Sequence, residues 1–401
     1  MDVLRLSGST YRPDAIVEGY TSMIWTERFK NFGSFELKTS KIEETFELLP
    51  LGSGITLLDS DEVMQVENHS LERTGGSSEL TVTGRTIETF LENRIMKSTV
   101  YGASWFPIQP YRDAEIIDLL LWNHLVNATG QDPTEFNKTI YTDTAVTGVV
   151  VTDSTSIADT TKLWALEAGE VYPKVQNFLG LTKLGVRNIR AKGSSAKVVN
   201  FDTSSASSRG TISKTTTNNI WTHRIDVYHG TDRTANQTIR EPVIFNYEAG
   251  HIDSPKYLVS NENVKNVATV ISAIGGGEVW AGAAQSGAYK KAMLIDAGTP
   301  AQGQNTTDFL NAAVQKATIE LAKHEQVVLF DGTISSSAPY KYGRDYFLGD
   351  YVTLMGEYNF QESMMISEYI RTSDMQGNRA FPGLTRLVSR EVYSDTVRKN
   401  K

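Results

Sequence analysis

The 401-residue chain contains no cysteine. Disulfides, thiolate metal ligands and cysteine nucleophiles are therefore excluded. Apolar runs of about eighteen residues, the length that a transmembrane helix needs, are also absent. The first residues lack a basic segment followed by an apolar core, so no secretory signal is expected. These absences indicate a soluble protein that is made in a reducing cytoplasm.

Clustered basic charge is missing as well. The chain has 39 Lys and Arg against 47 Asp and Glu, which gives a formal net charge of −8. Proteins that follow a nucleic-acid backbone neutralise its phosphates with grouped Lys and Arg. Specific nucleic-acid binding is therefore not expected, and a weakly acidic surface would keep DNA from adhering.

Motifs for catalysis and metal binding are absent too. Neither the His-Glu-x-x-His zinc motif nor the Gly-x-Ser-x-Gly nucleophile elbow occurs. Gly275–Gly277 is followed by no Gly-Lys-Ser/Thr, so it is not a phosphate loop. His124, His223 and His229 lack partners at ligand spacing. We predict no catalytic, cofactor-binding or metal-binding residues.

Paired carboxylates for glycoside cleavage stay open, because 47 acidic residues allow many pairs in space. The candidates Asp59, Asp61 and Glu62 lie in an expected turn, where solvated carboxylates are the normal finding.

What the sequence does contain is a strand phrase that occurs twice. Leu51–Leu58 and Leu348–Met355 both read Leu-Gly, two variable residues, a β-branched residue, Thr-Leu and an apolar residue. Glycine permits a positive φ at the entry to the strand, whose alternate side chains then point into a core. Two ordinary hairpins could look alike by chance. The matching order favours a duplicated β-module at the two ends of the chain.

The similarity continues downstream of each phrase. A second strand follows in each copy, with Val63–Glu67 matched to Met364–Glu368. A turn comes next, and then third strands are expected at Glu79–Thr83 and Leu384–Val388.

The length suggests about two to four domains. We predict an α+β protein, mainly β, with two small β-barrel domains at the two ends of the chain and α/β domains between them. The first barrel is expected over 1–100 and an α/β domain over 101–245. Residues 246–330 are expected to form strands, a hairpin and a helix that partly join the second barrel. The second barrel and a tail are expected over 331–401.

Helices and a hairpin are expected between the barrels. A helix follows the cap at Asp113–Glu115, a second occupies Thr160–Gly185, and a third runs from the cap at Thr306 to about His324. A hairpin is expected from Glu278–Ala283 and Tyr289–Asp296. Residues 131–161 are expected to form a surface hairpin or an extended loop.

Further short motifs follow one another along the chain: an opening Trp-x-x-Arg with Gly-x-Phe-x-Leu, a Gly-Arg after the third strand, a mid-chain Asp-Arg turn and a closing Leu-Gly-Asp. Their positions are Trp25, Arg28, Gly33, Phe35, Gly84, Arg85, Asp232, Arg233, Leu348, Gly349 and Asp350. Taken in order, these motifs resemble siphophage tail hub proteins. Where this family has a glycine-rich segment with an arginine, this chain has Gly275–Gly277 and Lys290-Lys291. Arg28, Arg85 and Arg94 could be binding residues, but we favour fork donors that satisfy carbonyls or carboxylates at domain edges.

The resemblance implies a homotrimeric structural hub at the virion tail tip, made in the bacterial host cytoplasm and related to the hub of contractile-tail baseplates. Three chains with two barrels each would present six similar barrels to a sixfold tail tube. The implied partners are the distal tail protein ring, the tape measure protein, and tail-tip fibre or receptor-binding proteins. DNA would meet the hub only in transit, along an axis that we expect to be acidic or neutral polar. The long C-terminal extension of some relatives is expected to be absent.

Two other functions compete with the hub. A tail-associated cell-wall hydrolase would use surface carboxylates. A carbohydrate-binding receptor module is supported only by 17 tyrosines and 6 tryptophans. A zymogram on host cell walls tests the first, and a glycan array tests the second.

Overall fold

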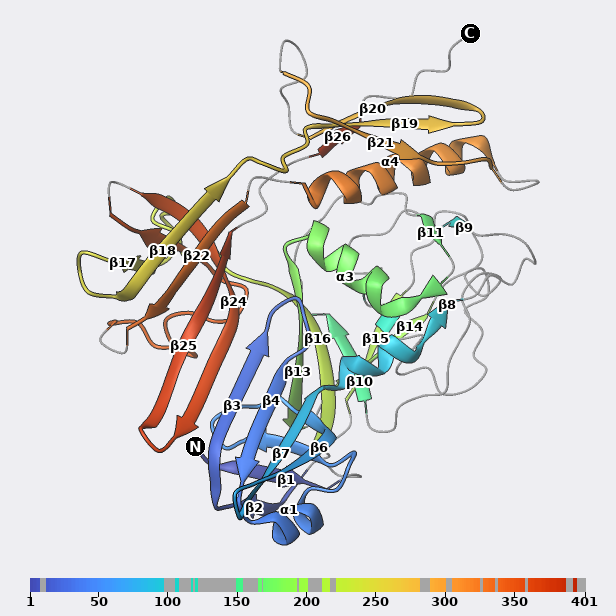
Figure 1. Cartoon of the computed structure of the whole chain (residues 1–401). Helices are drawn as coiled ribbons and strands as arrows, with labels where there is room; N and C mark the ends of the chain where they lie inside the picture. The colour runs from blue at the N-terminus through green and yellow to red at the C-terminus, as the bar shows by residue number, and fades with distance from the viewer. Residues whose placement is uncertain are drawn as a thin grey trace.

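The structure is a computed structural model, shown in Figure 1. It describes residues 1–7, 12–96, 105–107, 117, 120–121, 149–153, 165–167, 169–192, 195–200, 211–216, 221–281, 289–300, 305–324, 327–335, 338–357, 360–386 and 392–394. Of the helix expected after Asp113, only Ile117, Leu120 and Leu121 lie inside these ranges, and all three are helical and buried. The rest of that helix and most of the expected 131–161 hairpin lie outside the described residues.

The N-terminal part of the chain forms a β-module, here called the first module (blue in Figure 1). Its elements are β1 (Val3–Leu6), β2 (Pro13–Val17), β3 (Tyr20–Arg28), β4 (Ser34–Thr39), α1 (Ile42–Leu48), β5 (Gly54–Leu57), β6 (Met64–Thr74) and β7 (Ser77–Thr86). Burial alternates along β4, with Phe35 and Leu37 inward, as the sequence predicts. Trp25, Ile55 and Met64 are fully buried in the core of this module.

The second module is built mainly from the C-terminal part (red in Figure 1). Its strands are β17 (Ile244–Asn246), β18 (Ile252–Ser260), β22 (Val327–Ile334), β23 (Tyr351–Met355), β24 (Gln361–Asp374) and β25 (Gly377–Arg386). Phe245, Val352, Met364 and Ile366 are fully buried in its core.

One antiparallel junction joins the two modules. Residues 368–373 of β24 pair with β3, so that Glu368 lies opposite Arg28 and Ser373 lies opposite Met23. The result is one eleven-stranded sheet in the order β17-β23-β24-β3-β4-β7-β6-β5-β1-β2, with β25 on the other side of β24. In the described residues no strand closes this path into a barrel. The protein is thus mainly β, and the two closed barrels stay a prediction.

The duplication of the Leu-Gly phrase extends to backbone geometry. Gly52 and Gly349 both have a φ of 87°. The Gly52 N–H donates to the Val66 carbonyl at 2.8 Å, and the Gly349 N–H donates to the Ile366 carbonyl, also at 2.8 Å. A bulge follows directly after Val66 in β6 and after Ile366 in β24. The two Leu-Gly turns are therefore held by the same hydrogen bonds.

The strand registers repeat as well. Val66 lies opposite Gly84 in the first module, and Ile366 lies opposite Leu384 in the second. The matched residues differ by 300 in number, so Met64 corresponds to Met364. The match of Val63–Glu67 with Met364–Glu368 is therefore wrong by one residue, because the connection before the second strand differs in length between the two copies.

The third strands begin earlier than expected. A two-residue turn at Gly75-Gly76 leads directly into β7, and a turn at Met375-Gln376 leads directly into β25. Turns of this length keep the strands paired from their first residues, so the strands include the polar residues next to the turns.

The two modules share an order of six neighbouring strands. It is β3-β4-β7-β6-β5-β1 in the first module and β18-β22-β25-β24-β23-β17 in the second, where β18 and β22 form a separate two-stranded sheet and β22 lies beside β25. The last strands differ in direction, because β1 is antiparallel to β5 whereas β17 is parallel to β23. The members also follow each other in the same sequence along the chain. The sequence analysis detected only three of these six strands.

A middle part connects the modules. Its elements are η1 (Ile87–Asn93), β8 (Ile95–Met96), β9 (Trp105–Pro107), β10 (Val149–Asp153), β11 (Ala165–Glu167), β12 (Gly169–Glu170), α3 (Val171–Leu181), β13 (Leu184–Lys192), β14 (Ser195–Asn200), β15 (Thr211–Thr216) and β16 (Trp221–His229). The helix expected over Thr160–Gly185 is shorter than predicted, since α3 covers only Val171–Leu181. Strand β16 pairs with both β10 and β13.

A small α/β unit is inserted between β18 and β22, at the top of Figure 1. It contains β19 (Val267–Ser272), β20 (Gly275–Ala281), β21 (Ala292–Asp296) and α4 (Thr306–Ala322), and β26 (Val392–Ser394) pairs with β20. The predicted pairing of the hairpin is wrong: β19 lies between β20 and β21, antiparallel to the first and parallel to the second. The N-cap of α4 is Asn305, one residue before the predicted cap, and its side chain accepts from the Thr307 N–H.

Candidate functional site

A polar cavity lies where the two modules and the middle part meet, and we call this place the three-way junction. A cavity of about 170 Å³ is lined there by Glu27, Asp59, Ser60, Asp61, Glu62, Arg187, Ile189, Tyr228, Tyr342, Phe347, Leu348 and Arg371. The first module supplies Glu27 from β3 and Glu62 from the residues before β6. The second supplies Arg371 from β24, and β13 and β16 supply Arg187 and Tyr228.

Glu27 and Arg371 form a buried ion pair across the β3–β24 seam. Arg371 Nη1 donates to Glu27 Oε1, and the two residues are 6% and 5% exposed. Glu27 also accepts from Trp25 Nε1 at 3.2 Å, from Ser60 Oγ at 2.6 Å and from the Tyr342 hydroxyl at 3.2 Å. The carboxylate is thus fully partnered, as a buried charge must be to persist.

Aromatic rings enclose the arginine of this pair. Tyr342 and Tyr369 stack with ring centroids 3.8 Å apart, and the Arg371 guanidinium lies 4.7 Å from the Tyr369 centroid. Burial lowers the pKa of Arg371, but the charge of Glu27 and its hydrogen bond outweigh that effect and raise the pKa. The arginine stays charged and fixes the seam between the modules.

Glu62 is the unusual member of the three-way junction. Burial raises its pKa well above the ordinary value, and the charges of Glu27 and Glu88 raise it further. Its Oε2 has no hydrogen-bond partner among the described residues. The backbone around it is tied to β13, since the Val63 N–H donates to the Asn188 carbonyl at 3.2 Å. The expectation of a solvated carboxylate is wrong for Glu62 because this strand contact pulls it inside.

The other two turn carboxylates, those of Asp59 and Asp61, are exposed at the surface. Asp59 has a side chain 67% exposed and lies 3.6 Å from Arg371 Nε. Asp61 is exposed, and its carbonyl accepts from the Arg190 N–H at 2.6 Å. Among the described residues no three His, Asp or Glu side chains are grouped to hold a metal ion.

The second copy of the Leu-Gly phrase is enclosed on two sides. An added Cβ at Gly349 would lie 2.3 Å from the Phe29 ring, and one at Gly230 would lie 1.7 Å from the Gly349 carbonyl. Leu348 is buried in the core beneath this turn. The turn fits between β3 and the end of β16 only because these positions lack side chains.

Asp350 links this turn to the mid-chain Asp-Arg motif. Its carboxylate accepts from the Thr231 N–H at 2.7 Å, the Phe347 N–H at 3.0 Å and Arg233 Nε at 3.2 Å. Burial raises the pKa of Asp350, while these donors act against the shift. Asp232 caps its own turn, accepting from the Thr234 N–H at 2.9 Å. The structure therefore brings the mid-chain and closing motifs together, more than a hundred residues apart in sequence.

The remaining motif residues lie in the first module. Trp25 and Phe35 are buried and stack with centroids 6.2 Å apart. Gly33 and Gly84 lie where backbone and side chains approach closely: an added Cβ on Gly84 would be 1.9 Å from the Gln65 carbonyl oxygen, and one on Gly33 would be 2.8 Å from Met64.

Arg28 and Arg85 bind carboxylates and carbonyls at the edges of the module. Arg28 Nε donates to Glu368 Oε1 of β24 at 2.8 Å, and its Nη1 donates to the Phe32 carbonyl at 2.7 Å. Arg85 donates to both oxygens of Glu67 and both oxygens of Glu92. Their hydrogen bonds raise the pKa of Arg85 further. Arg28 therefore adds a second, half-exposed ion pair to the seam.

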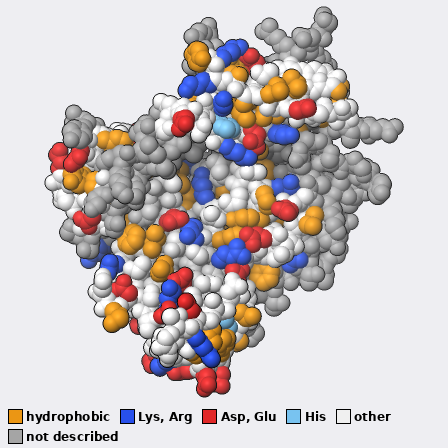
Figure 2. Space-filling view, viewed as in Figure 1, with side chains coloured by type: hydrophobic (Ala, Val, Ile, Leu, Met, Phe, Trp, Pro, Cys, Tyr) orange, Lys and Arg blue, Asp and Glu red, His pale blue; other side chains and the backbone are white. Residues whose placement is uncertain are grey.

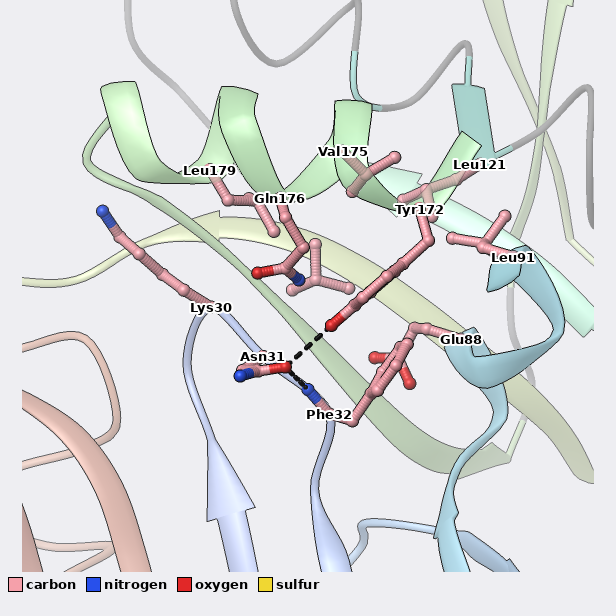
Figure 3. A pocket seen from close by; sticks show the side chains of 11 residues that line it. Lys30, Asn31, Phe32, Glu88, Leu91, Leu121, Tyr172, Val175, Gln176 and Leu179 are labelled. Carbon is pink, nitrogen blue, oxygen red and sulfur yellow. Dashed lines mark hydrogen bonds between the residues drawn. The ribbon is translucent and has the colours of Figure 1, made fainter. Parts of the chain in front are cut away.

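A second, smaller pocket lies under α3 (Figure 3). The Tyr172 hydroxyl donates to Asn31 Oδ1 at 2.7 Å, and the Tyr172 and Phe32 rings stack at 4.1 Å. Burial raises the pKa of Glu88, at one wall of the pocket, to about 7, and lowers the pKa of Lys30 to about 8. With about 10 Å³ of space, the pocket has room for about one water and not for a substrate.

The raised pKa of Glu88 predicts a pH-dependent stability. Between the ordinary value of 4.5 and about 7 the folded chain binds more protons than the unfolded chain, so this group's contribution is lost as the pH rises through that window. We expect Glu88→Gln to raise the unfolding free energy at pH 8 by about 3 kcal/mol and to change it little at pH 4. Urea titrations at both pH values measure this. The control Glu79→Gln, on the exposed face of β7, should follow the wild-type profile, and equal effects of Glu88→Gln at both pH values would contradict the prediction.

The three-way junction itself was missed by the sequence analysis. Glu27 and Arg371 are 344 residues apart, and Glu62 reads as an ordinary turn acid. The alternation Trp25-x-Glu27 on a strand places Glu27 on the same face as a buried tryptophan, which was the one available signal.

Solved structures with the same chain-wide arrangement are phage tail proteins. The 43 kDa tail protein of prophage MuSo2 from Shewanella oneidensis matches with a TM-score of 0.52 at 13% identity, over 96% of this chain and 98% of that chain. A tail protein from Neisseria meningitidis matches with a TM-score of 0.51 at 10% identity, over 96% of this chain and 95% of that chain. A prophage tail protein from Listeria monocytogenes matches with a TM-score of 0.47 at 8% identity over 97% of this chain and 95% of that chain, too low a score to compare folds. The chain therefore has a phage tail protein fold.

The sequence itself places the chain in a family. The pattern of the siphovirus ReqiPepy6 Gp37-like proteins matches residues 4–379, and the chain belongs to this family. The resemblance to a siphophage tail protein family is thereby confirmed. A comparison with curated proteins found no match.

Proposed function

We propose that this protein is a structural hub of a siphophage tail tip, in which three copies close the distal end of the tail tube and adapt its sixfold symmetry to a threefold tip. The observation that supports this most is the duplication. One chain carries two modules with the same strand order, the same glycine turn and the same register. Three such chains supply six similar modules, as a sixfold tube requires.

The three-way junction has a structural role in this proposal. A hub needs its two modules at a fixed angle, so that copies can join at equal steps. Glu27 and Arg371 hold the seam from within, and Arg28 with Glu368 holds it near the surface. The Leu-Gly turn, fitted between β3 and β16, fixes the third side of the same junction.

The surface charge agrees with a protein that DNA passes without binding. Figure 2 shows acidic and basic side chains interspersed over one face, with acidic side chains gathered over α1, whose first turn holds Glu43 and Glu44. No helix of the described segments is long and apolar enough to cross a membrane.

We propose the distal tail ring, the tape measure protein and tail-tip fibre or receptor-binding proteins as partners. The proposed location is the virion tail tip, and the proposed moving step is the opening of the tube for DNA ejection.

Stoichiometry tests the hub. We expect three copies per tail tip in images of assembled tails, with an interface of more than ~2,000 Å² between neighbouring copies. Light scattering on the purified chain should give a trimer, or a monomer that becomes trimeric on the tail. A stable dimer or tetramer, in solution and in the particle, would exclude this arrangement.

A further inference from the structure

Two of the open strand edges of this protein lie in β6 and β18. In the described part of the chain, residues 68–74 of β6 pair with β7 on one side and with no strand on the other. Among the same described residues, strand β18 pairs with β22 on one side and with no strand on the other. Such edges present unpaired backbone N–H and C=O groups, which favour pairing with another strand.

The counterparts of these two edges pair with each other inside the chain. Residues 368–373 of β24 correspond to 68–73 of β6, and β3 corresponds to β18 in the shared strand order. The seam between the modules is the pairing of β24 with β3. Each chain therefore uses one pair of edges internally and leaves the equivalent pair open.

Burial shows the difference that a partner makes. Leu71 is 41% exposed, whereas Arg371, its counterpart in β24, is 6% exposed. Asn68 and Ser70 are exposed, while their counterparts Glu368 and Ile370 are half-buried. An apolar side chain on an open strand edge is the kind of surface that self-association covers.

The bulges in β3 and β18 show which residues of these two strands correspond. Strand β3 has a bulge between Tyr20 and Ser22, followed by five paired residues ending at Thr26. Strand β18 has a bulge between Asp253 and Lys256, followed by five paired residues ending at Ser260. Thr26 therefore corresponds to Ser260. Because Thr26 lies opposite Ile370, the counterpart of Ser70, the repeated seam would place Ser70 opposite Ser260.

We propose that residues 68–74 of β6 pair antiparallel with Lys256–Ser260 of β18 in a second copy of this chain, repeating between copies the seam that joins β24 to β3 within one copy. The contact is head-to-tail, because each copy offers both edges, and such contacts close into a ring when the rotation permits. The closure at three copies rests on the proposed function. The identity of the paired strands and their register go beyond the proposed function.

The directions of the backbone N–H and C=O groups identify a residue pair that is suited to a disulfide test. The Phe29 N–H donates to the Ser367 carbonyl, which shows that Ser367 faces β3. The backbone N–H and C=O groups of successive residues in a strand point to opposite sides. Those of Arg371 therefore point toward β3, and those of Ile370 point toward β25. By correspondence the Leu71 N–H faces the second copy and the Ser70 N–H faces β7. Ser70 and Ser260 would form a non-hydrogen-bonded pair, with Cα atoms about 4.5 Å apart, within reach of a disulfide.

A disulfide tests the register, because the chain has no cysteine of its own. We expect Ser70→Cys/Ser260→Cys, oxidised in the purified chain and in tails assembled from it, to give a closed species of three covalently linked chains on a non-reducing gel. Thr26→Cys/Ile370→Cys is the positive control and should form a disulfide within one chain. Thr81→Cys/Ser260→Cys is the negative control, since Thr81 lies one strand further in, opposite Ser70 on β7.

The outcomes separate this inference from the proposed function. A trimer without linkage between chains, while the positive control is oxidised, overturns the strand pairing and leaves the hub standing. A chain that stays monomeric in solution and forms no multimer in tails overturns both the strand pairing and the hub.

An edge-blocking variant gives an independent measurement. Leu71→Pro removes an N–H on the open side and leaves the hydrogen bonds to β7. Pro382 already occupies such a position in β25, opposite Tyr369. We expect loss of self-association with unchanged circular dichroism. Undiminished self-association in this folded variant would also overturn the strand pairing.

Discussion

Replacing Arg371 by methionine should lower the unfolding free energy by about 3–5 kcal/mol, since it leaves the buried carboxylate of Glu27 without its cation. The pair is almost entirely buried, and Glu62 lies in the same cavity with a pKa already raised by burial and by Glu27. Loss of the positive charge would leave two acidic groups to share one enclosed space. Denaturant titrations at pH 7 measure the loss.

Two further variants identify the cause of that loss. Glu27→Gln in the Arg371→Met background removes the unpaired charge and should recover part of the stability. Arg379→Ala breaks an exposed ion pair with Asp374 in the same hairpin and should cost less than ~1 kcal/mol. If Arg371→Met costs no more than Arg379→Ala, the seam does not depend on the buried pair.

A methyl group on Gly84 should be nearly as damaging. Its Cβ would lie 1.9 Å from the Gln65 carbonyl oxygen and 2.5 Å from the Phe35 ring, so a backbone segment beside the β6 bulge must move. Overpacking of this kind costs about 3 kcal/mol when no flexible side chain can yield. We expect Gly84→Ala to lower the unfolding free energy by about that amount in urea titrations.

The matched control is Gly180→Ala in α3. Nothing lies within 4 Å of an added Cβ there, and the residue is exposed in a helix, where alanine is favoured over glycine by about 0.5–1 kcal/mol. The two glycine substitutions should therefore have opposite signs. A neutral Gly84→Ala would show that the β6–β7 register relaxes without cost.

The strand phrases were predictable because their causes are local. Gly52 and Gly349 must accept a positive φ, and the residues after them alternate between core and surface, so both copies were recognisable from letters alone. The one-residue error in matching the second strands arose in the connection before them, which differs in length between the copies. Loop length varies readily and leaves no signal in the strands that the loop joins.

Elements with few local signals were missed or misassigned. Helix α1 begins after Lys41, which makes no side-chain cap, so no capping residue marks its start. The strand expected from Glu278 begins three residues earlier, because Gly275–Gly277 already pair with β19 as the first residues of β20. Pairing between strands depends on which edges are open when the chain is folded, and a pattern within one strand does not contain that information.

The sequence by itself determined that this protein is mainly β, that it repeats a module and that it belongs with siphophage tail proteins, since glycine turns, alternation and motif order are properties of consecutive residues. Only the tertiary structure decided that the modules share one sheet and that Glu27 meets Arg371. It also left one edge of β6 and one edge of β18 without a paired strand among the described residues. The seam is made of backbone hydrogen bonds, which nearly any sequence can form, between strands more than three hundred residues apart. Which strands pair in the seam is therefore determined by the fold as a whole.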